Sequence, residues 1–140
     1  TEIYVRREDL VPFLAAARAD LVQHEVDVTY GTIRLIEPDE ETFLPWATKP
    51  WACIVINLHV THTDEGMRRA AENFQRLIDR AIELEGSYFL TYHRWATREQ
   101  VEGCYPRFPD MLRLKRNHDP DELFQSTWYR HYREMFADRL

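Results

Sequence analysis

The segment from residue 51 to residue 61 constrains the fold more than any other part of the chain. It reads Trp-Ala-Cys-Ile-Val-Ile-Asn-Leu-His-Val-Thr, so apolar and β-branched side chains occupy both of its alternating faces. A strand that is apolar on both faces is buried on both faces. The segment therefore predicts a sheet strand that other parts of the chain must cover.

Two more strands and two long helices are predicted around this segment. Residues 26–37 alternate in the manner of a strand, and residues 88–94 form a third strand. Residues 7–24 and 63–85 place apolar side chains at intervals of three and four, which is typical of amphipathic helices. The sheet and these two helices can share one core.

Local signals mark the helix ends. Thr63, or the residue after it, precedes the second long helix as an N-cap, and Gly86 follows that helix as a terminator. Thr97 with Gln100 three residues later forms a capping-box pattern, which predicts another helix start. A last helix is expected over about 126–137. Short helices divided by prolines therefore fill the last third of the chain.

The order of these elements predicts an α+β fold. An antiparallel sheet of three or more strands has helices packed on one face, as in a ferredoxin-like substrate domain. Residues 1–96 form the sheet and its helices, and residues 97–140 form a helical C-terminal tail. The tail is rich in aromatic and basic side chains, so we expect it to lie against another surface.

Composition and charge narrow the classes of function. The formal net charge of −6 argues against general binding of nucleic acid, which needs a basic surface. No apolar run reaches the roughly 18–20 residues that a membrane-spanning helix needs. Two cysteines without metal-ligand spacing predict no disulfide framework, no metal site and a reduced, cytoplasmic setting. The chain begins at Thr1 without a leader, which suits an absent or removed signal peptide or an excised fragment.

Glycine-rich loops that cradle phosphates are missing from the sequence. Its four glycines, at positions 31, 66, 86 and 103, are too far apart to form a nucleotide or dinucleotide fingerprint. A serine nucleophile elbow and a zinc-type His-Glu-x-x-His motif are also missing. If the chain takes part in redox chemistry, the phosphates of the cofactor are therefore held elsewhere.

Polar side chains interrupt all three predicted strands. Burial of an imidazole or a guanidinium costs several kcal/mol unless it is paired, so polar residues that converge on one sheet face need a reason. A bound ligand is one reason, and a face turned to solvent is the other. The residues in question are Thr32, Arg34, Asn57, His59, Tyr92 and His93.

Several stretches stand out as motifs. They are Tyr-Gly-Thr-Ile-Arg-Leu-Ile-Glu at 30–37, Ile-Asn-Leu-His at 56–59 and Tyr-Phe-Leu-Thr-Tyr-His-Arg-Trp-Ala-Thr at 88–97. The tail adds Cys-Tyr-Pro-Arg-Phe-Pro at 104–109 and Leu-Lys-Arg-Asn-His-Asp-Pro-Asp-Glu-Leu-Phe-Gln-Ser at 114–126. Together they resemble the FAD-linked oxidases of the vanillyl-alcohol oxidase superfamily, nearest the sugar-lactone and alditol oxidase branch.

The resemblance implies a division of labour. In that family an amino-terminal domain holds FAD, an antiparallel sheet covers the reactive face of the flavin, and the C-terminal segment returns to the flavin domain. The chain would then be the substrate-side part of a FAD-dependent oxidoreductase. It would oxidise an alcohol, hydroxy acid or sugar-type substrate by hydride transfer. Its partner would be a FAD-binding domain of the same polypeptide or complex, and the chain alone would be inactive.

The resemblance also implies roles for the polar residues. Arg34 matches an active-site arginine and His59 a polar active-site position, whereas Tyr92 stands where related enzymes often carry a catalytic lysine. Thr32 falls where an acidic residue is common, and we expect it to bind substrate together with Asn57 and His93. The departures at Thr32 and Tyr92 leave the alditol or lactone substrate open, but not the flavin chemistry.

The expected mechanism uses three of these residues. His59, or His93 if the strand register is shifted, would take the hydroxyl proton because the imidazole pKa lies near neutrality. Arg34 would stabilise an alkoxide or a substrate carboxylate, and Tyr92 would orient the hydroxyl. Two alternatives remain: a non-catalytic ferredoxin-like module that binds a small molecule or dimerises, and a complete dimeric enzyme without a cofactor.

Overall fold

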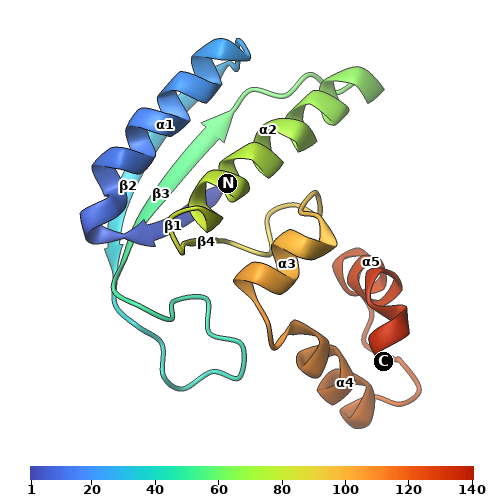
Figure 1. Ribbon diagram of the computed structural model, residues 1–140. Helices are drawn as coiled ribbons and strands as arrows, with labels where there is room; N and C mark the ends of the chain where they lie inside the picture. Colours follow the sequence, from blue (N-terminus) through green and yellow to red (C-terminus); the bar gives the residue numbers. More distant parts are fainter.

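The sheet has four strands, and every neighbouring pair in it is antiparallel. The computed structural model describes residues 1–140 (Figure 1). The strands lie in the spatial order β2-β3-β1-β4, so β3 has a partner on each side, as its apolar sequence requires. The strand bounds are Glu2–Arg6 (β1), Val28–Ile36 (β2), Trp51–Leu58 (β3) and Ser87–Tyr88 (β4).

Two long helices, α1 (Leu10–Gln23) and α2 (Asp64–Ile82), cover one face of this sheet (Figure 1). The chain order β1-α1-β2-β3-α2-β4 is that of a ferredoxin-like unit. The predicted α+β fold, with helices on one face of an antiparallel sheet, is thus confirmed. The covered face buries Ile3, Val5, Ala52, Ile54 and Ile56 against Phe13, Ala17, Leu77, Ile78 and Ala81.

The central strand β1 is an element that the sequence pattern did not reveal. It pairs with β3 from Glu2 opposite Val55 to Arg6 opposite Trp51, and with β4 on its other side. Its only signal is a short alternation in which Ile3 and Val5 face the core. Five residues at the start of a chain are too few for periodicity to identify a strand.

The third predicted strand is much shorter than expected. Only Ser87 and Tyr88 form β4, and the chain after Phe89 leaves the sheet. Packing explains the departure: the His93 ring stacks on Phe74 of α2, with ring centroids 4.4 Å apart. The prediction of a strand over 88–94 was therefore wrong beyond its first residues, because side-chain packing overrode the local strand propensity.

Helix ends follow the expected capping chemistry. The Thr63 hydroxyl accepts the Gly66 amide, and Thr97 and Gln100 form the complete capping box. Gly86 serves in a different way from the one predicted. Glu85 carries the left-handed conformation, with φ of 55°, whereas Gly86 is needed because a Cβ there would collide with the Tyr4 carbonyl oxygen.

The tail consists of α3 (Arg98–Cys104), α4 (Phe108–His118), α5 (Thr127–Met135) and a short 3-10 helix, η2 (Ala137–Arg139). Its aromatic side chains pack on one another: the Phe108 ring lies 5.0 Å from Tyr132 and 5.6 Å from Phe136 between centroids. These rings belong to the same core as the covered sheet face. The tail is therefore continuous with the sheet layer in its packing.

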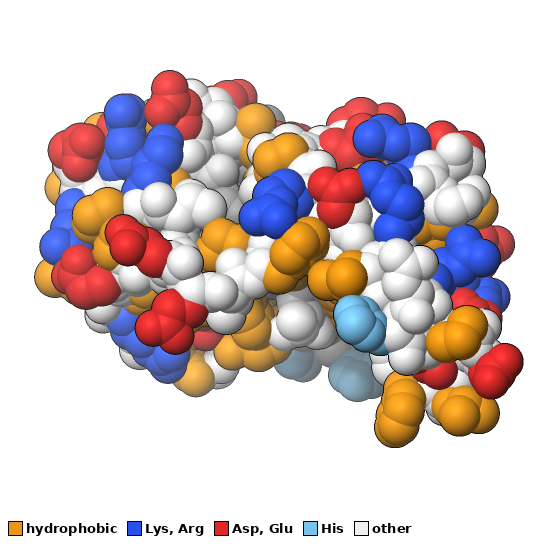
Figure 2. Space-filling model, turned by 90° about the horizontal axis from the view of Figure 1, so that it is seen from below, with side chains coloured by type: hydrophobic (Ala, Val, Ile, Leu, Met, Phe, Trp, Pro, Cys, Tyr) orange, Lys and Arg blue, Asp and Glu red, His pale blue; other side chains and the backbone are white.

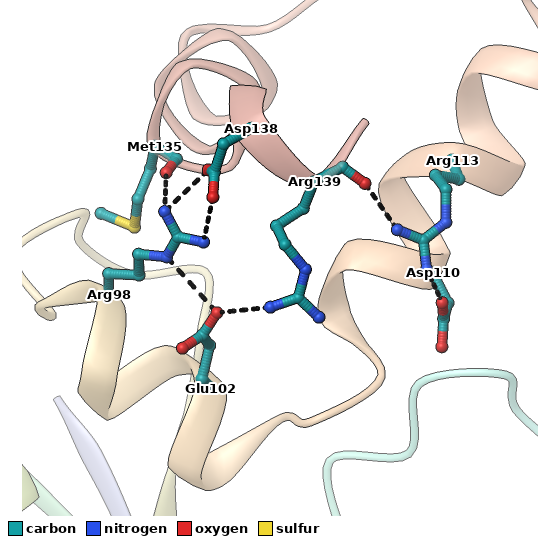
Figure 3. Close-up of polar contacts among 7 residues, drawn as sticks. All are labelled: Arg98, Glu102, Asp110, Arg113, Met135, Asp138 and Arg139. Atoms are coloured by element: carbon teal, nitrogen blue, oxygen red, sulfur yellow. Dashed lines mark hydrogen bonds and ion pairs between the residues drawn. The ribbon is translucent and has the colours of Figure 1, made fainter.

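Ion pairs fasten the end of the chain to α3 (Figure 3). The Arg98 guanidinium donates to both carboxylate oxygens of Asp138, at 2.7 and 2.9 Å. Glu102 accepts from Arg98 and from Arg139, at 3.3 and 3.2 Å. Bidentate pairs of this kind fix orientation as well as distance, so η2 is held in a defined position against α3.

Candidate functional site

The face of the sheet that α1 and α2 leave uncovered carries a buried carboxylate, that of Glu2. Only 6% of this residue is exposed. Its Oε1 accepts the Tyr92 hydroxyl at 2.9 Å and lies 3.7 Å from the Arg34 guanidinium. Its Oε2 accepts the Tyr4 hydroxyl at 3.0 Å and lies 3.6 Å from the Cys53 sulfur. Four side chains from four segments of the chain therefore converge on one acid.

This arrangement follows from strand alternation. Glu2 and Tyr4 are two apart on β1, so both point away from the helices, whereas Ile3 and Val5 point toward them. Cys53 opposes Tyr4 in the pairing of β1 with β3, and Arg34 opposes Cys53 in the pairing of β2 with β3. The strand register thus brings Arg34 near Glu2 from two strands away.

Beside Glu2 lies a hollow of about 420 Å³. It opens where β1 begins and is bounded by β2, β3, α2 and the segment that follows β4. Most of its wall consists of apolar or aromatic side chains, and the polar groups lie among them. The hollow is lined by Thr1, Glu2, Tyr30, Arg34, Val55, Asn57, Val60, Phe74, Tyr92, His93 and Trp95.

Four of the six residues singled out in the sequence line this hollow: Arg34, Asn57, Tyr92 and His93. Thr32 does not line it, although it lies between Tyr30 and Arg34 on β2. Thr32 instead borders a second, apolar groove between α1 and β2. The structure therefore brings most of the predicted set together, across the three segments expected to supply it.

His59 lies outside the hollow. β3 ends at Leu58, so His59 belongs to the turn that follows, and its side chain is 67% exposed. Its Nδ1 lies 3.1 Å from the Asp27 carboxylate, in a separate recess between the turn before β2, the end of β3 and α2. The expected alternation from Asn57 to His59 fails because the strand is shorter than the apolar run. His59 is therefore not placed to act with Arg34 and Tyr92.

The electrostatics of the Glu2 cluster keep its donors protonated. The hydrogen bond to Glu2 raises the pKa of Tyr92. Burial first, and then the Glu2 charge, raise the pKa of the Tyr4 phenol, and the same two causes raise the pKa of Cys53 to about 12. At neutral pH all three groups therefore keep their protons, and Cys53 is not a thiolate nucleophile.

His93 is held neutral by its surroundings. Burial lowers the pKa of His93 to about 4. Its ring packs against both Phe74 and Trp95, and its Nε2 lies 3.3 Å from the Thr1 hydroxyl. Its Nδ1 is buried without a partner. A neutral imidazole so placed binds or orients a polar ligand group better than it takes up a proton at pH 7.

Glu2 is the residue that the sequence reasoning missed. The strand that carries it was not predicted, so nothing indicated that Glu2 and Tyr4 share a face. The usable signal was the alternation Glu-Ile-Tyr-Val, in which polar and apolar side chains change at every residue. The aromatic walls Phe74 and Trp95 were also missed, because each lies at a position that reads as ordinary core packing.

Comparison with known proteins adds no relative. No protein-family model matches the chain, and no curated protein does. The structure has no helix long and apolar enough to span a membrane, and no group of three or more histidine, cysteine or acidic side chains is arranged to hold a metal ion. Function must therefore be argued from the geometry of the hollow and from the sequence motifs.

Proposed function

We propose that this chain is the substrate-side part of a FAD-dependent oxidoreductase that oxidises an alcohol, hydroxy acid or sugar-type substrate. One observation carries the proposal. A buried carboxylate on the open sheet face, Glu2, joins the Tyr92 hydroxyl and the Arg34 guanidinium at the wall of a hollow large enough for a small molecule. Resemblance of the sequence motifs to FAD-linked oxidases supplies the reaction class.

The hollow contains what the protein must contribute to such a reaction. The Arg34 side chain is 63% exposed, so its charge is available to a substrate carboxylate or to an oxygen that becomes negative. Asn57 and neutral His93 offer hydrogen bonds to further hydroxyl groups. Tyr30 and Trp95 give the substrate a flat apolar surface. These groups orient the substrate on the open side of the sheet.

Glu2 and Tyr92 replace His59 as the proposed route for the proton. Tyr92 donates to Glu2, so it can accept the substrate hydroxyl proton as its own proton moves to Glu2 Oε1. Hydrogen leaves the carbinol carbon as a hydride, and the substrate becomes a carbonyl compound. Bound FAD supplies the acceptor of that hydride. Carboxylate and phenol together thus hold the proton that the oxidation releases.

The cofactor fits only in part. The open face offers exposed aromatic and polar side chains to a flat ring, but the four glycines lie in separate places and build no phosphate cradle. We therefore assign the binding of FAD to a partner domain in the same polypeptide or complex.

The tail is the second surface that we assign to this partner. Leu123 and Phe124, between α4 and α5, are 78% and 80% exposed. Figure 2 shows hydrophobic side chains protruding at the end of the molecule formed by the C-terminal helices. The Leu123 and Phe124 amides both donate to the Asp119 carboxylate, so the loop is held in place.

Both cysteines are free thiols, which supports a cytoplasmic location.

Replacement of Arg34 tests the proposal. In the flavin-containing protein, Arg34→Ala should lower the rate of flavin reduction by substrate about 10²–10³-fold, the usual cost of losing one charge-stabilising donor. Stopped-flow absorbance of the flavin measures this rate. Arg69→Ala is the matched control, because Arg69 is also exposed but lines the separate recess near His59. Equal reduction rates in both variants would remove Arg34 from the site.

A non-catalytic module that binds a small molecule or dimerises is the second candidate. One observation favours it: an apolar groove of about 480 Å³ between α1 and β2, lined by residues such as Leu14, Leu21 and Ile33. Calorimetry on the chain alone distinguishes the two candidates. Tight binding of an apolar ligand, lost in Leu21→Asp and kept in Arg34→Ala, would favour the module.

A further inference from the structure

β2 is an edge strand whose outer backbone groups can be identified from the hydrogen bonds of its neighbours. Thr1 and Ile56 exchange both backbone bonds, so Ile56 faces β1 and the residues on either side of it, Val55 and Asn57, face β2. Thr32 is opposite Val55 in the β2–β3 pairing, so its backbone bonds to β3. The N–H and C=O groups of Gly31, Ile33 and Leu35 therefore point away from β3, toward the free edge of the sheet.

This edge has little protection against pairing: one irregularity between Val28 and Tyr30 and one charged side chain, Arg34. From Tyr30 to Ile36 the register with β3 is regular, and the strand contains neither proline nor lysine. Ile33 and Leu35 are 50% and 66% exposed although they lie on the helix-covered side. A regular edge with half-exposed apolar side chains is a template for another strand.

The apolar groove lies directly above this edge. α1 covers the middle of the sheet and leaves Val28 and Ile33 of β2 open, next to Leu21 and Val22 of the helix. Apolar side chains of an added strand would alternate toward the groove and fill it. Edge and groove are therefore two parts of one surface.

Charge disfavours a second copy of this chain as the occupant. A two-fold axis pairs β2 with itself in antiparallel fashion, so the start of one strand meets the end of the other. Both ends carry an excess of acids: Glu25 and Asp27 precede the strand, and Glu37 and Asp39 follow it, where Arg7 pairs with Glu37 alone. Like charges directly opposite one another destabilise a strand pair. The edge therefore suits a foreign strand whose ends are basic or uncharged.

We propose that β2 pairs with an extended strand of the flavin-holding partner, which continues the sheet and closes the apolar groove. This rests on the proposed function, because the hollow lies on the same strand: Tyr30 and Arg34 face it while Gly31 and Ile33 present their backbone outward. A partner that brings a flavin to Arg34 would lie close to this edge, because Arg34 is on the edge strand. The added strand would fix the partner relative to the hollow.

Amide hydrogen exchange tests the pairing without reference to activity. It is measured in the isolated chain and in the flavin-bearing assembly purified from its own cell. The amides of Thr32 and Arg34 should be slow in both, because they bond to β3. Those of Gly31, Ile33 and Leu35 should be fast in the chain alone and slower in the assembly by roughly a hundredfold or more. Unchanged exchange at these three positions would overturn the proposal.

Two variants and the oligomeric state complete the test. Ile33→Lys places an ammonium in the groove and should weaken the assembly at least about tenfold, whereas Met67→Lys, a similarly exposed change on α2, should not. An isolated chain that sediments as a dimer through this edge would overturn the proposal. Protection of the edge amides in an assembly without flavin would support strand pairing at β2 and contradict the proposed flavin chemistry. Fast exchange of the edge amides in a flavin-bearing assembly would contradict strand pairing and leave the flavin chemistry standing.

Discussion

The two faces of the sheet are made by alternate residues of the same strands, yet they differ in almost every physical respect. On β3, Ala52, Ile54 and Ile56 point into the helix layer, and Cys53 and Asn57 point the other way. The covered face is a continuous apolar core. The open face has a small apolar cluster around Tyr4 and Trp51, and beside it the carboxylate network of Glu2.

The two faces of the sheet therefore have different roles: the covered face contributes stability, and the open face carries the polar groups of the candidate site. A polar group on the covered face costs free energy unless it has a partner, because water is excluded there. The open face can carry an acid, a guanidinium and phenols because each is paired with another and the hollow admits solvent or substrate. Substitutions on the covered face should therefore change stability, and those on the open face should change charge and reactivity.

The largest expected effect is on the covered face. Ile54→Ala should lower the free energy of unfolding by about 2–5 kcal/mol, because Ile54 is only 3% exposed and its loss leaves a cavity against the helices. Val55→Ala, one residue along the same strand but on the half-buried open face, should cost clearly less. Urea denaturation followed by circular dichroism compares the two. Equal losses would mean that the two faces contribute alike.

A smaller effect comes from His93, the partly buried imidazole at the wall of the hollow. Its folded pKa of about 4 lies below the ordinary value of 6.5, so between these values the unfolded chain binds a proton that the folded chain does not. Stability should therefore fall as the pH drops from about 6.5 to 4, by on the order of 3 kcal/mol in total. Below pH 4 this contribution should change no further.

Two variants separate this contribution from that of other titrating groups. His93→Phe keeps the stacking with Phe74 and Trp95 but removes the imidazole, so its unfolding free energy should depend less on pH between 4 and 6.5. Trp95→Phe, which keeps the imidazole and an aromatic neighbour, should retain the dependence. Denaturation midpoints at a series of pH values give both profiles. A wild-type dependence in His93→Phe would contradict the burial argument.

The same contrast explains which structural features could be predicted from the sequence. Periodicity identified the strand at 51–58, both long helices and the capping of α2 and α3, since those features are local. Register is not local: the meeting of Arg34 with Glu2 depends on β1, which is too short to show a pattern. The prediction for His59 was wrong because the apolar run that contains it is three residues longer than the strand. The strand ends at Leu58, so His59 lies beyond it.

Glu2→Gln is the smallest change and the one that most directly tests the open face. The amide keeps the shape but replaces one acceptor oxygen by a donor, so it faces either the Tyr4 or the Tyr92 hydroxyl with a mismatched group. The cost in stability should be about 1–2 kcal/mol, below that of Ile54→Ala. Loss of the charge should also lower the pKa of Tyr92, since its hydrogen bond to Glu2 is what raises it.

Ultraviolet difference titration of the phenols measures that pKa, with Tyr92→Phe to identify the Tyr92 signal. Tyr129, whose pKa is raised by burial and by its hydrogen bond to Glu122, is the internal control and should titrate alike in wild type and Glu2→Gln. A Tyr92 pKa that stays raised without the Glu2 charge would mean that solvent exclusion alone sets it. In that case the carboxylate could not be the proton acceptor behind Tyr92, and the open face would differ from the covered face only in polarity.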